Sequence, residues 1–473
     1  MNPVSESLLE RTSTGVVEDQ ELYLAPEDYS LLTDLYQLTM ATCYVGESIE
    51  QTQASFELFT RRLPEGFGYL IAMGLAQALD YLEKFRFNSR QIQALQSTGI
   101  FENAPERFWQ LLAEAKFTGD VWAVPEGTAI FAHEPLLRIE APLWQAQLVE
   151  TYLLNTLNYQ TLIATRAARL RDVAGTEATL LEFGTRRAFS PQGSIWAARA
   201  ALAAGLDGTS NVLAALKLGR KPVGTMAHAL VMALSTLEGS EDQAFTVFHH
   251  YFPGASLLID TYDTVAAAQH LAAQVQQGKI ELTGIRLDSG DLVQLSKTVR
   301  SLLPEIAIFA SGDIDEGEIA RLKAAGAEID GYGLGTKLVS GTPVNGVYKL
   351  VEIAGQPVMK ESSGKATYPG RKQIIRTLKQ GQLVSDCLVL MDEIPTFCPD
   401  QSNGSTRQSI KLLQQVMQQG QRLQSVETLD TISQRTARSV ASLPLELRQV
   451  QQPEPFVASI SPELQAVTEQ TRH

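Results

Sequence analysis

The sequence predicts an α/β protein whose central part, residues 146–345, is an irregular β/α barrel. From about Thr176 to Thr336, short apolar runs that suit buried strands alternate with longer helical segments. This alternation is typical of a parallel sheet covered by helices, and at this length it favours a β/α barrel or a close variant of one. The expected strands are 179–183, 256–260, 284–287 and 306–310, and the expected helices are 196–204, 264–277, 291–303 and 315–325.

Residues 28–145 are expected to form an N-terminal α+β domain, preceded by a mobile polar leader at 1–27. The first helix of this domain has Thr33 or Asp34 as its N-cap, because both side chains can accept a hydrogen bond from the first turn. Three short apolar runs separated by Pro-Glu-Gly and His-Glu-Pro then predict a small antiparallel meander. These runs are 121–124, 129–131 and 136–139.

Residues 346–473 are expected to form a C-terminal extension. The apolar runs 347–353 and 356–360 predict a hairpin. The following Gln-rich region, including 413–424, is expected to be helical at most, with a solvated surface. Residues 451–473 are expected to be a weakly ordered tail.

Charge and composition exclude several partners. The 473 residues include 39 Lys and Arg against 53 Asp and Glu, a formal net charge of -14. Such an acidic surface repels nucleic acid and anionic membranes, so neither is expected as a partner, and basic residues that bind an anion must be concentrated locally. The three scattered cysteines, the missing secretory signal and the absence of a long apolar run favour a cytoplasmic location.

Polar residues recur at the predicted ends of successive strands. Because the carboxyl ends of barrel strands meet at one rim, we expect these segments to line one site. The segments are Glu182–Arg187, Asp207–Ser210, Gly224–His228, Asp260–Asp263, Asp288–Asp291, Ser311–Asp313 and Gly333–Thr336.

The chemistry of these segments suits a phosphorylated sugar. Glycines and hydroxyl residues at helix N-termini let backbone N–H groups approach phosphate oxygens, and the best candidates are Ser311 with Gly312 and the segment Gly333–Thr336. Asp288 offers oxygen ligands for Mg²⁺ or for ribose hydroxyls. Asp291 can do the same or simply cap a helix. Arg186 and Arg286 can each pair with a carboxylate or a phosphate.

Six peptides of this chain, from about residue 28 to about residue 400, resemble the signature peptides of the nicotinate phosphoribosyltransferase family. That family has a type II phosphoribosyltransferase fold, so the resemblance agrees with the predicted barrel. The peptides are Thr33–Met40, Glu182–Arg187, Gly224–His228, Gly284–Asp291, Tyr332–Thr336 and Pro369–Gln373.

The resemblance implies an enzyme of NAD biosynthesis. Its substrates would be nicotinate and phosphoribosyl pyrophosphate, and its products nicotinate mononucleotide and pyrophosphate. ATP would be a co-substrate, hydrolysed through a phosphorylated histidine, with Mg²⁺ as cofactor. The resemblance also implies a homodimer in which the N-terminal region of one subunit closes the barrel mouth of the other.

The resemblance also implies roles for individual residues. Tyr36, Thr225 and Arg286 would contact nicotinate, with Arg186 as a competitor for its carboxylate. His228 would be the phosphorylated residue and would act in catalysis with Arg286 and Asp288. The residues that hold ribose and phosphates would be Asp288, Ser311, Gly312, Asp313, Gly333, Gly335 and Thr336.

Two residues bear on specificity. We expect Arg186, and not Arg187, to line the site, because neighbouring side chains on an extended segment face opposite ways. Ser210 stands where a related nicotinamide-using enzyme carries an aspartate, which would repel a carboxylate; serine therefore favours nicotinate. The alternatives are a nicotinamide-preferring enzyme, a quinolinate-using relative and a catalytically silent homologue that binds nucleotides.

Overall fold

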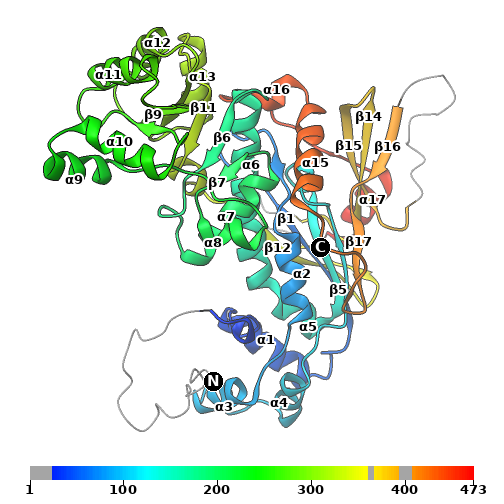
Figure 1. Cartoon of the computed structure of the whole chain (residues 1–473). Coiled ribbons are helices and arrows are strands. Elements are labelled where there is room, and N and C mark those ends of the chain that lie inside the picture. Colours follow the sequence, from blue (N-terminus) through cyan, green and yellow to red (C-terminus); the bar gives the residue numbers. More distant parts are fainter. Residues whose placement is uncertain (1–23, 361–366, 394–406, 473) are drawn as a thin grey trace.

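The structure is a computed structural model that describes residues 24–360, 367–393 and 407–472. Figure 1 shows the β/α part, in green, at one end of the molecule, and helices α1, α3 and α4 at the other end. Between them lie the long helix α6 (Glu150–Ala174) and an antiparallel sheet. No helix in these described ranges is long and apolar enough to cross a membrane.

The predicted alternation of strands and helices is confirmed. Six parallel strands form one sheet in the order β7-β6-β11-β10-β9-β8. The strands are β6 (Thr179–Glu182), β7 (Gly208–Thr209), β8 (Leu257–Leu258), β9 (Gly284–Leu287), β10 (Ala307–Ser311) and β11 (Gly331–Leu334). The helices between and after them are α7 (Pro191–Ala203), α8 (Val212–Lys217), α9 (His228–Glu238), α10 (Glu241–Tyr251), α11 (Thr264–Gln276), α12 (Leu292–Leu302), α13 (Glu316–Ala324) and α14 (Thr336–Val339).

The segment that ends at His228 is not a strand, contrary to expectation. It is attached to the sheet by a hydrogen bond from the Val223 N–H to the Thr209 carbonyl oxygen at 2.9 Å. Pro222 has no N–H to donate, and Gly224 has a φ of 151°. Both features prevent a regular ladder, so the segment runs across the mouth of the barrel as an irregular chain.

A seven-stranded antiparallel sheet, in the order β13-β12-β1-β5-β3-β17-β18, combines N-terminal and C-terminal segments. Its strands are β1 (Gln53–Thr60), β3 (Asp120–Ala123), β5 (Pro135–Pro142), β12 (Gly346–Ile353), β13 (Gln356–Pro357), β17 (Gln414–Gln418) and β18 (Gln421–Arg422). The helices of the N-terminal part are the 3-10 helix η2 (Pro26–Asp28), α1 (Leu35–Gly46), α2 (Leu75–Glu83), α3 (Ser89–Ser97), α4 (Glu106–Ala113) and α5 (Leu143–Leu148).

The predicted meander is wrong in its middle strand. β3 and β5 pair directly, whereas β4 (Ala129–Ile130) pairs with β2 (Leu70–Ile71) in a separate two-stranded sheet. The chain reverses at His133, whose φ is 66°, and so returns beside β3 without β4 between them. The predicted hairpin is confirmed, since β12 and β13 are antiparallel.

The C-terminal region is more ordered than expected. It adds a sheet in the order β16-β14-β15-β19, formed by β14 (Lys372–Lys379), β15 (Gln382–Leu390), β16 (Arg407–Lys411) and β19 (Ser459–Ile460). The Gln-rich stretch is strand β17, not a helix, because β3 supplies a partner and Met417 is fully buried. The tail ends in α17 (Pro462–Thr471), capped by Ser461 and anchored by the buried Leu464. Helices α15 (Leu429–Ala441) and α16 (Leu445–Arg448) precede it.

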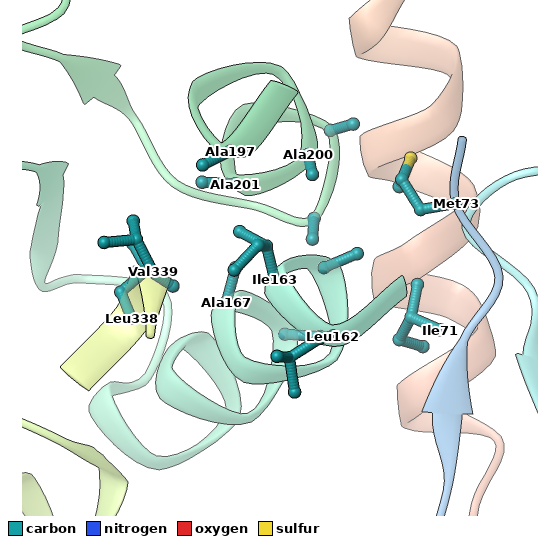
Figure 2. Close-up of a cluster of buried hydrophobic side chains, with 14 of the residues drawn as sticks. Ile71, Met73, Leu162, Ile163, Ala167, Ala197, Ala200, Ala201, Leu338 and Val339 are labelled. Atoms are coloured by element: carbon teal, nitrogen blue, oxygen red, sulfur yellow. The ribbon is translucent and has the colours of Figure 1, made fainter. Parts of the chain in front are cut away.

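Both the β/α part and the seven-stranded sheet pack against helix α6. Figure 2 shows Ile163 and Ala167 of α6 beside Ala197 and Ala201 of α7, with residues of α14 on the same side. The alanines leave room for the two helix backbones to approach closely. α6 therefore fixes the β/α part, which carries the candidate site, against the seven-stranded antiparallel sheet.

Candidate active site

A cleft of about 1170 Å³ opens at the carboxyl ends of the parallel strands. Eleven of the thirteen residues predicted for the site line this cleft. They are Arg186, Ser210, Thr225, Arg286, Asp288, Ser311, Gly312, Asp313, Gly333, Gly335 and Thr336. A smaller and more apolar cavity of about 230 Å³ shares several of these residues and reaches towards Ala255 and Phe309.

Arg286 lies on β9 and lines both cavities. Its Nη1 donates to Thr225 Oγ1 at 3.2 Å, and its Nη2 donates to the Met226 carbonyl oxygen at 3.1 Å. Its Nε is buried without a hydrogen-bond partner among the described residues. Burial lowers the pKa of Arg286, and the positive charge of Arg186 lowers it further. The negative charges of Asp288 and Asp260 raise this pKa and so oppose the shift. A half-buried cation with an unused donor is suited to an anionic ligand.

The Asp288 loop is tied to both neighbouring strands. The Ser311 hydroxyl donates to Asp288 Oδ1, and Asp260 Oδ2 accepts from the Asp288 N–H at 2.8 Å and from the Ser289 hydroxyl at 2.7 Å. Gly312 closes against this loop with a φ of 90°. These contacts fix the Asp288 carboxylate at the floor of the cleft, where it can bind hydroxyl groups or a cation.

Asp291 acts as the N-cap of α12. Its Oδ1 accepts from the N–H groups of Val293 and Gln294, at 3.1 and 3.2 Å. Of the two roles that the sequence left open for Asp291, the structure supports the helix cap.

Arg186 and Arg187 both line the cleft, so the expectation that only one would do so is wrong. Residues 185–187 form a turn and not an extended segment, with the Arg187 N–H bonded to the Gly184 carbonyl oxygen at 2.8 Å. The buried Glu182 carboxylate supports this turn by accepting from the Gly184 N–H and the Thr209 hydroxyl. Burial raises the pKa of Glu182. A turn carries both cations to one side, where an extended strand would separate them.

His228 is the first residue of α9 and is half-buried. Its Nδ1 lies 3.1 Å from Thr261 Oγ1, in the loop that follows β8. The preceding residues Gly224 to Ala227 line the cleft, whereas His228, which follows them directly in the chain, is not among its lining residues. The imidazole is therefore held at the edge of the cleft with its Nδ1 occupied.

Tyr36 is not brought to the cleft within one chain. It lies on α1, with 48% of its surface exposed, at the end of the molecule opposite the β/α part in Figure 1. It is the one predicted site residue that this chain places far from the others.

Sequence reasoning missed Phe183 and Phe252. Phe183 follows β6 and lines both cavities, and Phe252 lines the cleft from the end of α10. The signal for Phe183 was an aromatic residue between Glu182 and Gly184 at a strand end, where a planar ligand ring can pack on it. Phe252 follows a helix, so no strand-end signal marks it.

The fold is that of a β/α-barrel enzyme, with a cleft lined by Arg186, Arg187 and Arg286 at the carboxyl rim of the strands. Comparison with known families gives three matches: nicotinate phosphoribosyltransferase N-terminal domain over residues 31–158, nicotinate phosphoribosyltransferase family over 178–310, and nicotinate phosphoribosyltransferase C-terminal domain over 371–468. The chain belongs to the nicotinate phosphoribosyltransferase family.

Individual relatives agree with this membership. The chain is 40% identical to nicotinate phosphoribosyltransferase pncB2 of Mycobacterium tuberculosis, over 89% of each chain, and 42% identical to the Bacillus subtilis nicotinate phosphoribosyltransferase, over 78% and 77%. Its fold is similar to the crystal structure of human nicotinic acid phosphoribosyltransferase, with a TM-score of 0.79 and 31% identity over 93% and 99% of the two chains. The nicotinate-nucleotide pyrophosphorylase from Pyrococcus furiosus has a TM-score of 0.72 at 26% identity, over 89% and 98%. The predicted fold class is thereby confirmed.

Proposed function

We propose that this chain is a nicotinate phosphoribosyltransferase of NAD salvage, which joins nicotinate to the phosphoribosyl group of phosphoribosyl pyrophosphate and releases pyrophosphate. Family membership over most of the chain supports this activity. The observation that carries it is Arg286, a half-buried cation in the cleft whose Nε has no partner among the described residues. The carboxylate group of nicotinate is the anion that pairs with this guanidinium.

The ring of nicotinate binds at the junction of the two cavities. Arg286 and Arg186 pair with its carboxylate, the Thr225 hydroxyl contacts it, and the face of Phe183 packs on the ring. Ser210, at the end of β7, places no negative charge beside the carboxylate. The ring nitrogen is already nucleophilic, so the protein needs no base to activate it.

The phosphoribosyl group binds over the Asp288 loop. Asp288 accepts from the ribose hydroxyls, and the backbone and hydroxyls of Ser311, Gly312 and Gly333–Thr336 approach the phosphates, together with Asp313. Catalysis is then mainly positioning and stabilisation of the departing pyrophosphate. Mg²⁺ when bound would neutralise pyrophosphate charge, and the single central carboxylate of Asp288 fits an ion held mostly by substrate phosphates and water.

ATP enters as a co-substrate through His228. The neutral imidazole attacks the terminal phosphorus of ATP, the bond to ADP breaks, and water later releases the phosphoryl group as phosphate. The position of His228 at the N-terminus of α9, beside the cleft, supports this role because helix N-termini favour phosphate.

The active enzyme is a homodimer in which Tyr36 enters the partner's cleft. Tyr36 is exposed and remote from its own cleft. On the seven-stranded sheet, burial lowers the pKa of Lys349, and the charges of Arg61 and Lys360 lower it further. The Arg61 Nε is buried without a partner in the described ranges. A ring that is exposed and far from its own cleft can enter the cleft of a second subunit and pack on the pyridine ring bound there.

Mixed dimers test the shared site. Tyr36→Ala and Arg286→Ala should each inactivate a homodimer, because every site then lacks one group. Unfolding and refolding the two variants together should restore about a quarter of the wild-type activity, because half of the dimers are mixed and each has one intact site. Activity that stays at the level of the separate variants would refute sharing.

The activity itself is tested with competing substrates. Nicotinate, nicotinamide or quinolinate is supplied with phosphoribosyl pyrophosphate, Mg²⁺ and ATP, and mononucleotide and ADP are measured. We expect product with nicotinate. Product with nicotinamide or quinolinate alone would identify a related activity, and no product with any of the three would identify a silent nucleotide-binding homologue.

A further inference from the structure

The smaller cavity, of about 230 Å³, continues beyond the part that it shares with the cleft. Half of its lining residues, Phe183 and Arg286 among them, also line the cleft and mark the junction of the two cavities. The other half line the smaller cavity alone, and we call the part that they line the inner recess. These residues are Leu181, Gly254, Ala255, Ser256 and Phe309.

The inner recess lies deeper in the barrel than the junction. β9 runs from Gly284 to Leu287, so Arg286 stands between Gly284, inside the barrel, and Asp288 at the rim. A Cβ atom added at Gly284 would clash with Ser256 Oγ, which places this recess residue at the depth of Gly284. The inner recess and the Asp288 loop are therefore on opposite sides of Arg286.

Glycines keep this part of the barrel interior open. Arg286 registers with Phe309 of β10, which registers with Gly331 of β11. Registered residues of parallel strands point to the same side of the sheet, so these three positions face the interior together. Such positions are ordinarily filled by branched apolar side chains, but Gly284 and Gly331 have none. The Phe309 ring lies against both glycines, because an added Cβ atom would lie 2.6 Å from it at Gly331 and 3.3 Å from it at Gly284.

The inner recess has room for more than an unsubstituted pyridine ring. Phe309 is only half-buried although it lies inside the barrel, so part of its ring faces open space. Unfilled apolar cavities destabilise a fold, so an open interior beside a cleft indicates a place for a ligand. A cavity of about 150 Å³ can hold benzene. A cavity of about 230 Å³ therefore has room for a pyridine ring and a small substituent, even if the whole ring enters it.

The proposed function fixes the direction of the ring. The ring nitrogen must face the ribose over the Asp288 loop, while the carboxylate at carbon 3 pairs with Arg286 at the junction. Carbons 4 and 5 of the ring then face the inner recess. The neighbouring carboxylate crowds carbon 4, so carbon 5 is the position that can carry a substituent into the recess. Carbon 6 is next to the nitrogen and faces the ribose.

We propose that the inner recess is a subsite for a small apolar substituent at carbon 5 of the pyridine ring, so that the substrates of this enzyme include 5-alkyl nicotinates as well as nicotinate. The inference rests on the proposed function, which supplies the orientation of the ring. It excludes pyridine acids that carry a substituent beside the ring nitrogen.

Methyl-substituted acids test the subsite in the wild-type enzyme. Each acid is supplied with phosphoribosyl pyrophosphate, Mg²⁺ and ATP, and the mononucleotide is measured. Burial of one methyl group should lower the KM for 5-methylnicotinate about fourfold relative to nicotinate. The matched control is 6-methylnicotinate, which should be a poor substrate. A KM for 5-methylnicotinate that is no lower than that for nicotinate would overturn the proposal.

Ser256→Val tests the location of the subsite, because it fills part of the inner recess. The KM for 5-methylnicotinate should rise roughly tenfold, since one methyl group in an apolar pocket has effects of this size. The KM for nicotinate should change less than twofold, because Ser256 does not line the junction. Ser301→Val is the control and should alter neither KM, because Ser301 is exposed on α12. Equal rises for both acids in Ser256→Val would refute this location.

Binding without phosphoribosyl pyrophosphate separates the inference from the proposed function. In calorimetric titrations, 5-methylnicotinate should bind to the wild type roughly tenfold more tightly than to Ser256→Val. Ala255→Leu also fills the inner recess and should act in the same way if Ser256→Val does not fold. If the protein made no nicotinate mononucleotide but this difference held, the proposed function would fail while the subsite stood. If nicotinate were converted but the wild type and the filled variants bound 5-methylnicotinate equally, the subsite would fail while the proposed function stood.

Discussion

A Cβ atom added at Gly312 would lie 2.4 Å from the carbonyl oxygen of Asp288. Gly312 also has a φ of 90°, which side chains rarely adopt. The floor of the cleft is thus built by a backbone contact that a glycine alone allows.

Gly312→Ala should therefore displace the Asp288 loop and lower kcat/KM roughly 100-fold, since small misplacements of a catalytic group have effects of this size. Gly219→Ala is the control, because Gly219 has a φ of 66° with nothing within 4 Å of the added Cβ. It should cost about 1–2 kcal/mol of stability and leave kcat/KM unchanged. Equal losses of activity in the two variants would contradict a specific role for the Gly312–Asp288 contact.

His228→Ala should abolish ATP hydrolysis and the incorporation of acid-labile phosphate, but leave some ATP-independent synthesis of mononucleotide. The reason is that the histidine serves the ATP step and not the attack on ribose. Radiolabelled ATP and acid treatment measure the modification. His270→Ala is the control, because His270 is exposed and pairs with Asp242. Undiminished phosphorylation of His228→Ala would reject the assignment.

Ser210→Asp should move the preference from nicotinate towards nicotinamide. A carboxylate in the cleft repels the nicotinate carboxylate and can accept from an amide, so the ratio of the two kcat/KM values should fall at least about tenfold. Ser301→Asp adds the same charge on the exposed surface of α12 and should leave the ratio unchanged. A constant ratio in Ser210→Asp would show that this residue does not face the ring substituent.

Glu241 should make stability depend on pH. Burial and, after it, the negative charges of Asp242, Asp263 and Asp260 together raise the pKa of Glu241 to about 7. The folded state then keeps a proton that the unfolded chain releases above the ordinary value of 4.5, so the free energy of unfolding falls as pH rises from 4.5 to about 7.

Glu241→Gln should remove this fall. Denaturant titrations of the variant and the wild type across that pH window give the difference between their free energies of unfolding. The variant should gain stability relative to the wild type as pH rises, and the gain should be largest above pH 7. Glu106→Gln is the control and should follow the wild type, because Glu106 is an exposed residue at the start of α4. A difference that does not change with pH would contradict the buried acid at Glu241.

Much of the site could be predicted from the sequence because barrel strands are parallel. Every strand then ends at the same rim, so Arg286, Asp288, Ser311 and Gly333 could be grouped without any structure. The same logic failed where local backbone geometry decides direction. Arg186 and Arg187 lie on a turn, and the chain before His228 is not a strand.

Long-range pairing was beyond the sequence. The stretch around Met417 forms a strand because it pairs with β3, which lies almost three hundred residues earlier in the chain. β4 pairs with β2 and not with the strands next to it in the sequence. Strand propensity depends on such partners, so short polar or apolar runs do not reveal their sheet.

The sequence by itself determined the alternation of strands and helices, the chemistry of the strand-end loops and the family. Local spacing and residue type carry that information. Only the tertiary structure decided that Tyr36 lies far from its own cleft (Figure 1), that Arg186 and Arg187 both line the cleft, and that Arg286 keeps an unused donor. Those relationships depend on burial and on contacts between distant segments, which no local pattern records.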